Sequence, residues 1–188
     1  MPLVFAFFRR VLPLFAPSLL LGLLGGVLLL LRPLPYKRQA DIVIIVALGV
    51  VLAIALVVGA RVLERLLPSY RFAQQQMERA LRPLRLTRLQ ALLLAAVTSV
   101  AEELFFRGAL LSLIGVWGQA LAFGLLHPAT RRGWSYSAYT AVAGLIFGYT
   151  TLLTGSLWAA VVAHFLINTQ GFFELRRRSK RLSQPRNS

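Results

Sequence analysis

An uninterrupted apolar run from residue 42 to 60 limits the folds open to this chain, because it holds no charged side chain. A helix of about 20 apolar residues can cross the hydrocarbon core of a bilayer. Of the 188 residues, 57% are hydrophobic, and the mean hydropathy of +0.70 is too high for an ordinary soluble domain. We therefore predict an all-α, polytopic integral membrane protein with about six transmembrane helices. The other five apolar runs cover 11–31, 89–113, 116–127, 137–153 and 157–173.

Basic residues flank the apolar runs, and their distribution predicts the orientation of the chain. Six spans place both termini on one side, where 17 of the 21 Lys and Arg residues fall; three fall on the opposite side and Arg107 lies within a span. Because basic residues are retained on the cytoplasmic side, we expect both termini to be cytoplasmic. This predicts a multi-pass protein of the cell membrane, which in a bacterium is the inner membrane. The net charge of +15 then reflects topology and contact with anionic lipid, not binding of nucleic acid.

These patterns divide the chain into three parts. Residues 1–88 hold two N-terminal transmembrane helices and a basic interfacial loop, residues 89–173 form a four-helix core, and residues 174–188 form a basic cytoplasmic tail. Within the loop, a helix over about 69–81 would place its apolar side chains at a lipid interface, and a solvated loop is an equal alternative. The absence of cysteine excludes disulfides, thiolate metal sites and cysteine nucleophiles. The oligomeric state is left open.

Three charged residues, Glu102, Glu103 and Arg107, interrupt the apolar run from 89 to 113. An ionisable side chain at the centre of a membrane helix costs at least about 2.5 to 3.5 kcal/mol, so pairing or function must offset it. Glu103 and Arg107 are four residues apart and share a helix face, which predicts a structural ion pair. Glu102 points about 100° away and is left without a partner on its own helix.

Both histidines of the chain fall in later apolar runs, each four residues from a second notable side chain. His127 follows Phe123 at the end of the fourth run, and His164 precedes Asn168 in the sixth. A cluster of Glu102, two imidazoles and a carboxamide in hydrocarbon suits hydrolysis, because a desolvated glutamate can act as a general base on water and the others can stabilise an oxyanion. Glu102, His127 and His164 are also a common ligand set for Zn²⁺ or another divalent metal. The sequence does not choose between a metal and a metal-free glutamate mechanism.

Glycines indicate where the helices bend or approach one another. For Glu102 and His127 to lie at one depth, we expect the span 116–127 to be kinked or shifted, with Trp117, Gly118 and Gly124 as candidate positions. The small-residue pairs Gly22 with Gly26 and Gly144 with Gly148 allow helices to approach closely. We expect both pairs to pack within the chain.

The order and spacing of the polar residues resemble the CPBP family, which comprises intramembrane CAAX prenyl-protein endopeptidases and bacteriocin-processing enzymes, also called Abi proteins. The resemblance extends over about 89–173 and rests on three motifs in order: Glu102-Glu103-x-x-x-Arg107, Phe123-x-x-x-His127 and His164-x-x-x-Asn168. It implies an intramembrane protease in which Glu102 and His127 activate water while His164 and Asn168 stabilise the oxyanion. Glu103, Arg107 and Phe123 would support them. The implied substrate is a prenylated or leader-bearing peptide or protein in the membrane.

Two other functions stay open at this point. A proton-coupled transporter or channel could use the same glutamate and histidines as a relay, although six spans without an inverted repeat make this less favoured. A non-catalytic bacteriocin-immunity or scaffold protein would tolerate the loss of all four polar residues. A liposome flux that depends on Glu102 would favour the transporter.

Overall fold

The computed structural model describes the backbone of residues 2–31, 40–127 and 130–182, and the side chains of residues 16–31, 40–127 and 130–178. All regular secondary structure in these residues is helical, which confirms the predicted all-α class. A π-helix, η2 (Leu104–Leu110), and two 3₁₀ turns, η1 (Arg82–Leu84) and η3 (Arg131–Gly133), lie between α-helices. The α-helices are α1 (Pro2–Leu31), α2 (Ile42–Leu66), α3 (Pro68–Leu81), α4 (Arg88–Glu103), α5 (Leu111–Leu126), α6 (Trp134–Thr154) and α7 (Trp158–Leu182).

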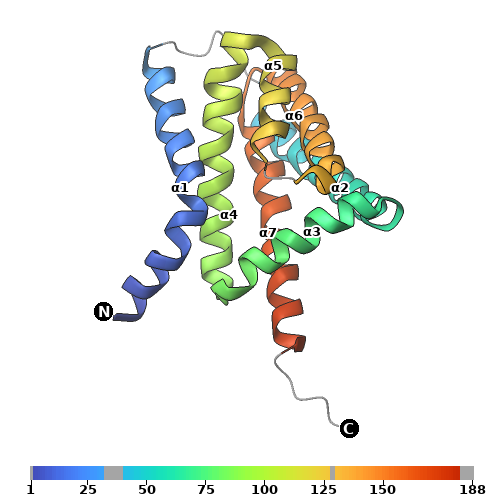
Figure 1. The fold of residues 1–188 in the computed structure, drawn as a ribbon. Helices are drawn as coiled ribbons and strands as arrows, with labels where there is room; N and C mark the ends of the chain where they lie inside the picture. Colours follow the sequence, from blue (N-terminus) through green and yellow to red (C-terminus); the bar gives the residue numbers. More distant parts are fainter. Residues whose placement is uncertain (1, 32–39, 128–129, 183–188) are drawn as a thin grey trace.

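Six of these helices form a bundle of alternating direction, and the shorter α3 lies across one end of it (Figure 1). The helix α1 packs on α4 and η2, α7 packs between α2 and α4, and α5 packs on α6. The start of α1 and the end of α7 therefore lie at the same end of the bundle (Figure 1). This arrangement brings the predicted site residues of α4 and α7 and the C-terminal end of α5 close to one another.

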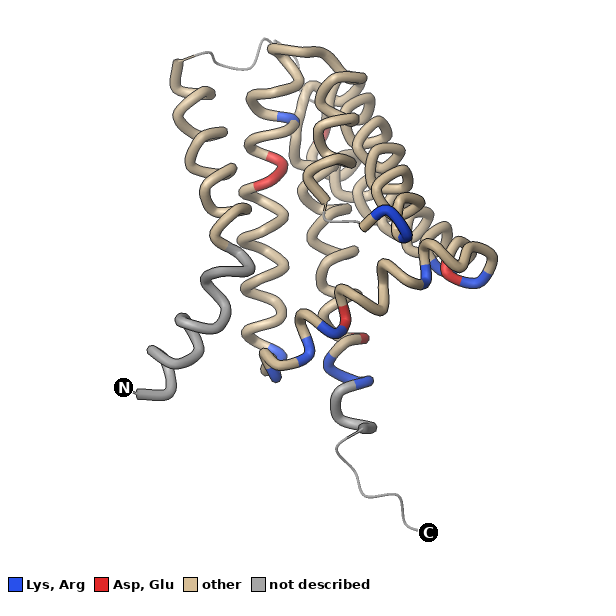
Figure 2. Tube along the Cα trace, in the orientation of Figure 1, with Lys and Arg blue, Asp and Glu red and all other residues tan. Residues whose placement is uncertain are grey.

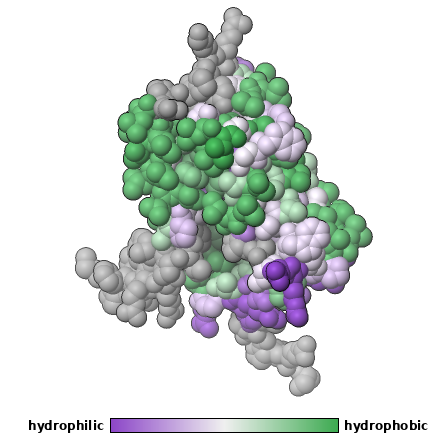
Figure 3. All heavy atoms as spheres, turned by 45° about the horizontal axis from the view of Figure 1, so that its top comes forward, coloured by the Kyte–Doolittle hydropathy of each residue, from purple (hydrophilic) through white to green (hydrophobic). Residues whose placement is uncertain are grey.

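The outer surface of the bundle is apolar, as expected for helices that face lipid. Large hydrophobic side chains are exposed on α1, α2, α4 and α5, with Leu30 85% exposed, and they cover most of the upper body in Figure 3. Charged residues gather instead at the end where α3 lies (Figure 2). Among the described residues, Ile42–Leu66 and Arg88–Leu126 are long and apolar enough to cross a membrane. The presence of membrane-spanning helices is thus supported, while the number of six spans and their orientation in the membrane stay predictions.

The connection between α4 and α5 contains the irregularity that the site requires, at the gap between the predicted spans 89–113 and 116–127 and not within the second of them. Gly115 has φ 72° and ψ 178°, a conformation that is essentially restricted to glycine. The chain reverses there, whereas Trp117, Gly118 and Gly124 lie in regular helix, so the predicted positions of the kink were wrong. Glu102 precedes Gly115 by 13 residues and His127 follows it by 12. The two arms differ by one residue, and this near equality returns both side chains to a similar level.

Local signals explain where several helices begin. Thr87 and Gln90 form a capping box at the start of α4, with each side chain bonded to the backbone N–H of the other residue. The Asp41 carboxylate accepts from Val43 N at 2.7 Å at the start of α2, and Pro68 occupies the first turn of α3. The helix predicted over 69–81 is confirmed by α3, whose Tyr70 and Ala73 are buried.

Parts of the predicted loops and tail lie outside the described residues. The residues predicted as a basic tail, 174–188, continue α7 as helix up to Leu182. The three basic residues that were assigned to the side opposite the termini, Arg32, Lys37 and Arg38, fall outside the described residues, as do residues 183–188.

The glycine pairs pack within the chain, except that Gly25 takes the place of Gly26 in the first pair. Gly144 and Gly148 face α5, where an added Cβ would meet Ala120 at 3.0 Å and the Gln119 side chain at 2.5 Å respectively. Gly22 packs on Ala101, but an added Cβ at Gly26 would meet nothing within 4 Å. Gly25 makes the second close approach of α1 instead, so the Gly22 and Gly26 pairing was wrong.

Candidate active site

A buried ion pair forms the base of the site. Arg107 Nη1 donates to Glu103 Oε1 at 2.8 Å, and neither side chain is exposed to solvent. This is the pair that the four-residue spacing predicted. The same Glu103 Oε1 also lies 2.8 Å from Nδ1 of His164, a contact that the sequence did not indicate. The arginine also lies over aromatic rings, with its Cζ 4.4 Å from the centroid of Phe123.

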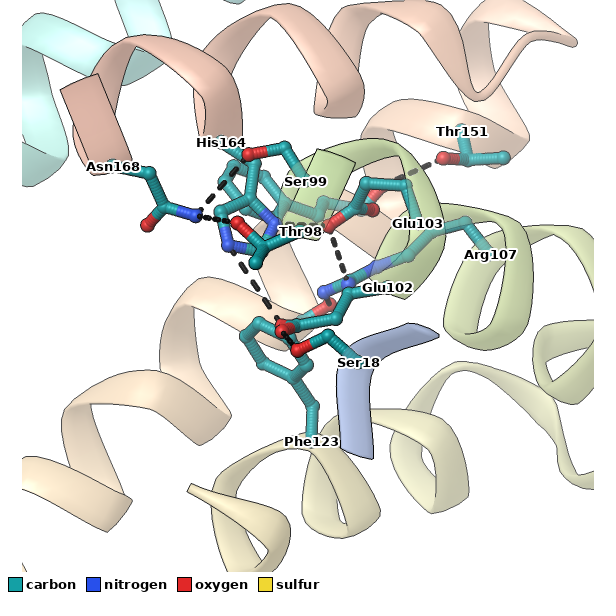
Figure 4. A network of polar contacts seen from close by, with 12 residues as sticks. Ser18, Thr98, Ser99, Glu102, Glu103, Arg107, Phe123, Thr151, His164 and Asn168 are labelled. Carbon is teal, nitrogen blue, oxygen red and sulfur yellow. Dashed lines mark hydrogen bonds and ion pairs between the residues drawn. The ribbon is translucent and has the colours of Figure 1, made fainter. Parts of the chain in front are cut away.

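Glu102 points to a different face of α4 from Glu103, toward Ser18 of α1 and toward His164 (Figure 4). Its Oε1 accepts a hydrogen bond of 2.7 Å from Ser18 Oγ on α1. Its Oε2 lies 3.8 Å from His127 Nε2 and 3.9 Å from His164 Nε2. No described residue hydrogen-bonds to this buried Oε2. One carboxylate oxygen is therefore anchored, and the other faces two imidazoles.

Both imidazoles are held through Nδ1, which settles what Nε2 can do. His127 Nδ1 lies 2.7 Å from the carbonyl oxygen of Phe123, and a carbonyl can only accept, so this nitrogen carries a proton. His164 Nδ1 faces the Glu103 carboxylate, which also accepts. In the neutral form of either ring, Nε2 then presents a lone pair toward Glu102. Phe123 contributes its carbonyl to this arrangement, and its ring contacts the His127 ring at a centroid distance of 4.4 Å.

Asn168 is bound to α4 one helical turn before the two glutamates. Its Nδ2 donates to Thr98 Oγ1 at 3.1 Å and to Ser99 Oγ at 3.2 Å. Thr98 gives its only proton to Leu94 O at 2.8 Å, so it must accept from the amide, and this fixes the amide orientation. Both amide hydrogens of Asn168 are therefore engaged by hydroxyl groups. An oxyanion could receive one only if a hydroxyl contact were released.

A cavity of about 750 Å³ leads from the charged end of the bundle to the two histidines. Its inner lining includes Phe123, His127, His164 and Asn168, and its outer lining includes charged residues of α2, α3 and α7. Glu102 does not line the cavity and its side chain is 14% exposed. A substrate in the cavity would therefore meet the imidazoles first, with Glu102 next to them on the α1 side.

The donor atoms of the site have the chemistry of a zinc centre but not its spacing. Two unprotonated Nε2 atoms and a free carboxylate oxygen are typical ligands. Zinc–ligand distances of about 2.0 to 2.1 Å imply about 3.3 Å between tetrahedral ligands, whereas the glutamate oxygen lies 3.8 and 3.9 Å from the two nitrogens. Within the described part of the chain, no group of three His, Asp or Glu residues is arranged to hold a metal ion.

The structure thus brings together Glu102, His127 and His164 and places Asn168 on the cavity wall. Three polar contacts were missed by the sequence: Ser18, Thr98 and Ser99. Thr98 and Ser99 precede Glu102 and Glu103 by four residues, and this helical spacing could have indicated them. Ser18 stands alone in an apolar helix, with no pattern to mark it.

These features define a helical protein of membrane character with a polar, glutamate- and histidine-containing centre inside its apolar bundle. Residues 84–170 match a family model described as type II CAAX prenyl endopeptidase Rce1-like. This segment, somewhat under half of the chain, is thus similar to the CAAX prenyl endopeptidases of the CPBP family, in agreement with the resemblance that the three motifs indicate. The family is one of proteases, and the match ends before α7 does and begins after α3.

One curated relative supports the same family. The uncharacterized protein YpbD of Bacillus subtilis is 32% identical over 75 residues. The aligned part covers 40% of this chain and 40% of that relative. No solved structure matches the chain.

Proposed function

We propose that the protein is an intramembrane endopeptidase that hydrolyses a peptide bond of a membrane-associated peptide or protein. The observation that carries this proposal is the free Oε2 of Glu102, which lies within 3.9 Å of two imidazole Nε2 atoms inside an apolar bundle. The family match supports the reaction class. A prenylated C-terminus and a bacteriocin leader are the substrate features that the family suggests.

Glu102 and His127 activate the water in this proposal. A water molecule between Glu102 Oε2 and His127 Nε2 donates one hydrogen bond to each acceptor. Its oxygen attacks the carbonyl carbon while one proton moves to the glutamate. When the tetrahedral intermediate collapses, the C–N bond breaks and the proton passes to the leaving nitrogen. General base catalysis of this kind contributes about 10² to 10⁴ in rate.

His164 and Asn168 stabilise the oxyanion, and each must change state to do so. His164 Nε2 can donate only while the ring carries a second proton, and Nδ1 of that ring donates to the Glu103 carboxylate in either case. Asn168 must release Thr98 or Ser99 before its Nδ2 can donate to the substrate. Both changes fit a donor that forms its bond in the transition state and not before.

The site operates in a multi-pass cell-membrane protein of six spans, with both termini in the cytoplasm and basic residues on anionic lipid. The alternating helices, the apolar outer surface and the charged end near α3 support this placement. The cavity then opens toward the cytoplasm. The four-helix part from 89 to 173 would be the catalytic core and α1, α2 and α3 its accessory elements.

Replacement of Glu102 by Gln tests the proposal. Membranes that carry the wild-type protein or Glu102→Gln at equal abundance are compared for peptides with new termini. We expect termini that appear only with the wild type, because the amide cannot take a proton from water. Equal termini in both would remove Glu102 as the base, and a Glu102-dependent ion flux in liposomes would favour a transporter instead.

Removal of metal separates the two forms of the mechanism. Cleavage that stops on treatment with a chelator and returns with Zn²⁺ would support a metal held by Glu102, His127 and His164. Cleavage that persists would support the metal-free form, which the spacing of the three groups favours.

A further inference from the structure

The hydroxyl of Ser18 contacts the proposed base from outside the segment that defines the family. It lies on α1, whereas the family match begins at residue 84. Ser18 Oγ donates to Glu102 Oε1 at 2.7 Å across 84 residues of sequence. We infer that Ser18 is a positioning residue of the catalytic centre, which anchors one oxygen of Glu102 so that the other faces the water site. This inference rests on the proposed function.

The direction of the Ser18 proton distinguishes it from several threonine hydroxyl groups of the bundle. Thr98, Thr150 and Thr151 each donate to a carbonyl of their own helix one turn earlier. This is how a hydroxyl is normally satisfied within an apolar helix. A hydroxyl has a single proton, and Ser18 gives its proton to a carboxylate on another helix. A hydrogen bond to an ionised acceptor is the stronger kind.

The anchor makes the two oxygens of Glu102 inequivalent. The terminal torsion of a glutamate side chain is soft and roughly two-fold, so an unanchored carboxylate would rotate and exchange its oxygens. With Oε1 bound to Ser18, Oε2 lies in the gap between His127 and His164 and has no hydrogen-bond partner among the described residues. Figure 4 shows Ser18 and the His164 imidazole on different sides of the carboxylate.

Close packing fixes the position of α1, and therefore of Ser18. An added Cβ at Gly22 would lie 2.6 Å from Ala101 Cβ, and one at Gly25 would lie 2.6 Å from Phe105 N. Farther along α1, an added Cβ at Gly108 would lie 2.8 Å from Cδ1 of Leu29. Because these contacts run parallel along α4 and η2, α1 cannot slide without separating from them. The catalytic centre is accordingly incomplete without α1.

The test combines a kinetic and a structural measurement on the full chain. Ser18→Ala removes the hydroxyl, Ser18→Thr retains it, and Ser112→Ala is the control because that hydroxyl is bonded only to Ala109 O of its own turn. The substrate is the membrane protein identified by its Glu102-dependent termini. Melting temperatures of Ser18→Ala, Glu102→Ala and the double variant are measured in detergent.

We expect Ser18→Ala to lower kcat by about 10- to 100-fold, as for other residues that orient a reacting group, with KM little changed. Ser18→Thr should recover most of the loss and Ser112→Ala should cause none. Ser18→Ala should lower the melting temperature in the wild-type background and not in Glu102→Ala.

Two results would overturn the inference, and each differs from a failure of the proposed function. Additive melting shifts would show that the bond is absent in the membrane protein, whatever the reaction. Coupled shifts with unchanged kcat would make Ser18 a structural contact only. If the wild type gives no Glu102-dependent cleavage at all, the proposed function fails, and the positioning role fails with it even where the shifts are coupled.

Discussion

At the scale of single residues, Glu103 connects two parts of the site through a single carboxylate oxygen. One of its oxygens accepts from both Arg107 Nη1 and His164 Nδ1 at 2.8 Å, and the side chain is fully buried. It therefore joins the structural ion pair to an imidazole of the proposed centre. The sequence predicted the first contact from helical spacing, while the second depends on the packing of α7 against α4 and has no local signal.

We expect Glu103→Gln to destabilise the protein severely. The substitution leaves Arg107 as a buried charge without a counterion, and breaking such a pair typically costs about 3 to 5 kcal/mol. The free energy of unfolding, measured in detergent, should fall by about this amount. Glu78→Gln is the control, because its pair with Arg178 is partly exposed and such pairs contribute about 0 to 1 kcal/mol. Equal losses in both variants would contradict the structural role of Glu103.

For Asn168, the residue pattern predicted the helix face on which the side chain lies but not its hydrogen-bond partners. Its four-residue spacing from His164 placed both on the face of α7 that reaches the cavity. The spacing could not show that Thr98 and Ser99 hold both of its amide hydrogens. Those contacts depend on how α4 and α7 are rotated relative to each other, which a single sequence does not specify.

At the scale of helices, the sequence predicted the elements better than their irregularities. The predicted starts at 42, 69 and 89 lie within one residue of the first residues of α2, α3 and α4, whereas the predicted ends at 60 and 113 differ from the ends of α2 and α4 by six and ten residues. The π-helix η2 was not anticipated, because a π-helix has no periodic signature. The reversal at Gly115 falls in the gap between the predicted spans 89–113 and 116–127, although nothing in the sequence indicated the positive φ of this glycine. These two irregularities lie between Glu102 and His127, and π-helical turns often occur at functional sites.

Two adjacent glycines on α1 provide a matched test of helix packing. A Cβ at Gly25 would lie 2.6 Å from Phe105 N and 2.7 Å from Leu104 C, both of them backbone atoms, whereas one at Gly26 would meet nothing within 4 Å. We expect Gly25→Ala to cost about 1 to 3 kcal/mol of stability through overpacking and to reduce Glu102-dependent cleavage, since Ser18 moves with α1. Gly26→Ala should be neutral or stabilising by up to about 1 kcal/mol.

Thermal unfolding and cleavage measured on this pair of variants separate helix propensity from packing. Both substitutions add the same methyl group to the same helix, so propensity changes equally in each. If the two variants behaved alike, α1 would not be docked on η2 as the structure has it.

At the scale of the whole molecule, one arginine holds the charged end of the cavity together. Arg178 on α7 lies 3.1 Å from Glu78 on α3, 2.7 Å from Glu174 on its own helix and 3.8 Å from Glu64 on α2. Burial alone would raise the pKa of Glu174, but hydrogen bonds from Arg178 and Gln170 outweigh it and leave the pKa below its ordinary value. These contacts link three helices around the opening that a substrate would use.

The lowered pKa of Glu174 predicts how this cluster responds to acid. A carboxyl whose pKa is lower in the folded state contributes stability above its unfolded pKa and loses it as the pH falls through the folded pKa. The stability difference between the wild type and Arg178→Gln should therefore be full near neutral pH and shrink below about pH 4.5. Melting temperatures of both, recorded from neutral to acidic pH, measure it. Arg71→Gln is the control, because Arg71 donates only to the carbonyls of Glu64 and Arg65, and its effect should not depend on pH.

The orientation of the molecule in the membrane can be tested with unusual clarity because the chain contains no cysteine. Gln75 on α3 lies at the charged end of the bundle, whereas Ser112 lies beside the reversal between α4 and α5 at the opposite end. If basic residues retain the charged end in the cytoplasm, Gln75→Cys should react with a membrane-impermeant maleimide only in inverted vesicles. Ser112→Cys should react only from the outside of intact cells. The opposite pattern would turn the cavity, and with it the proposed substrate, to the outer face of the membrane. Labelling of both positions from one side would mean that α4 does not cross the membrane, and the bundle would then have to be placed at the membrane surface.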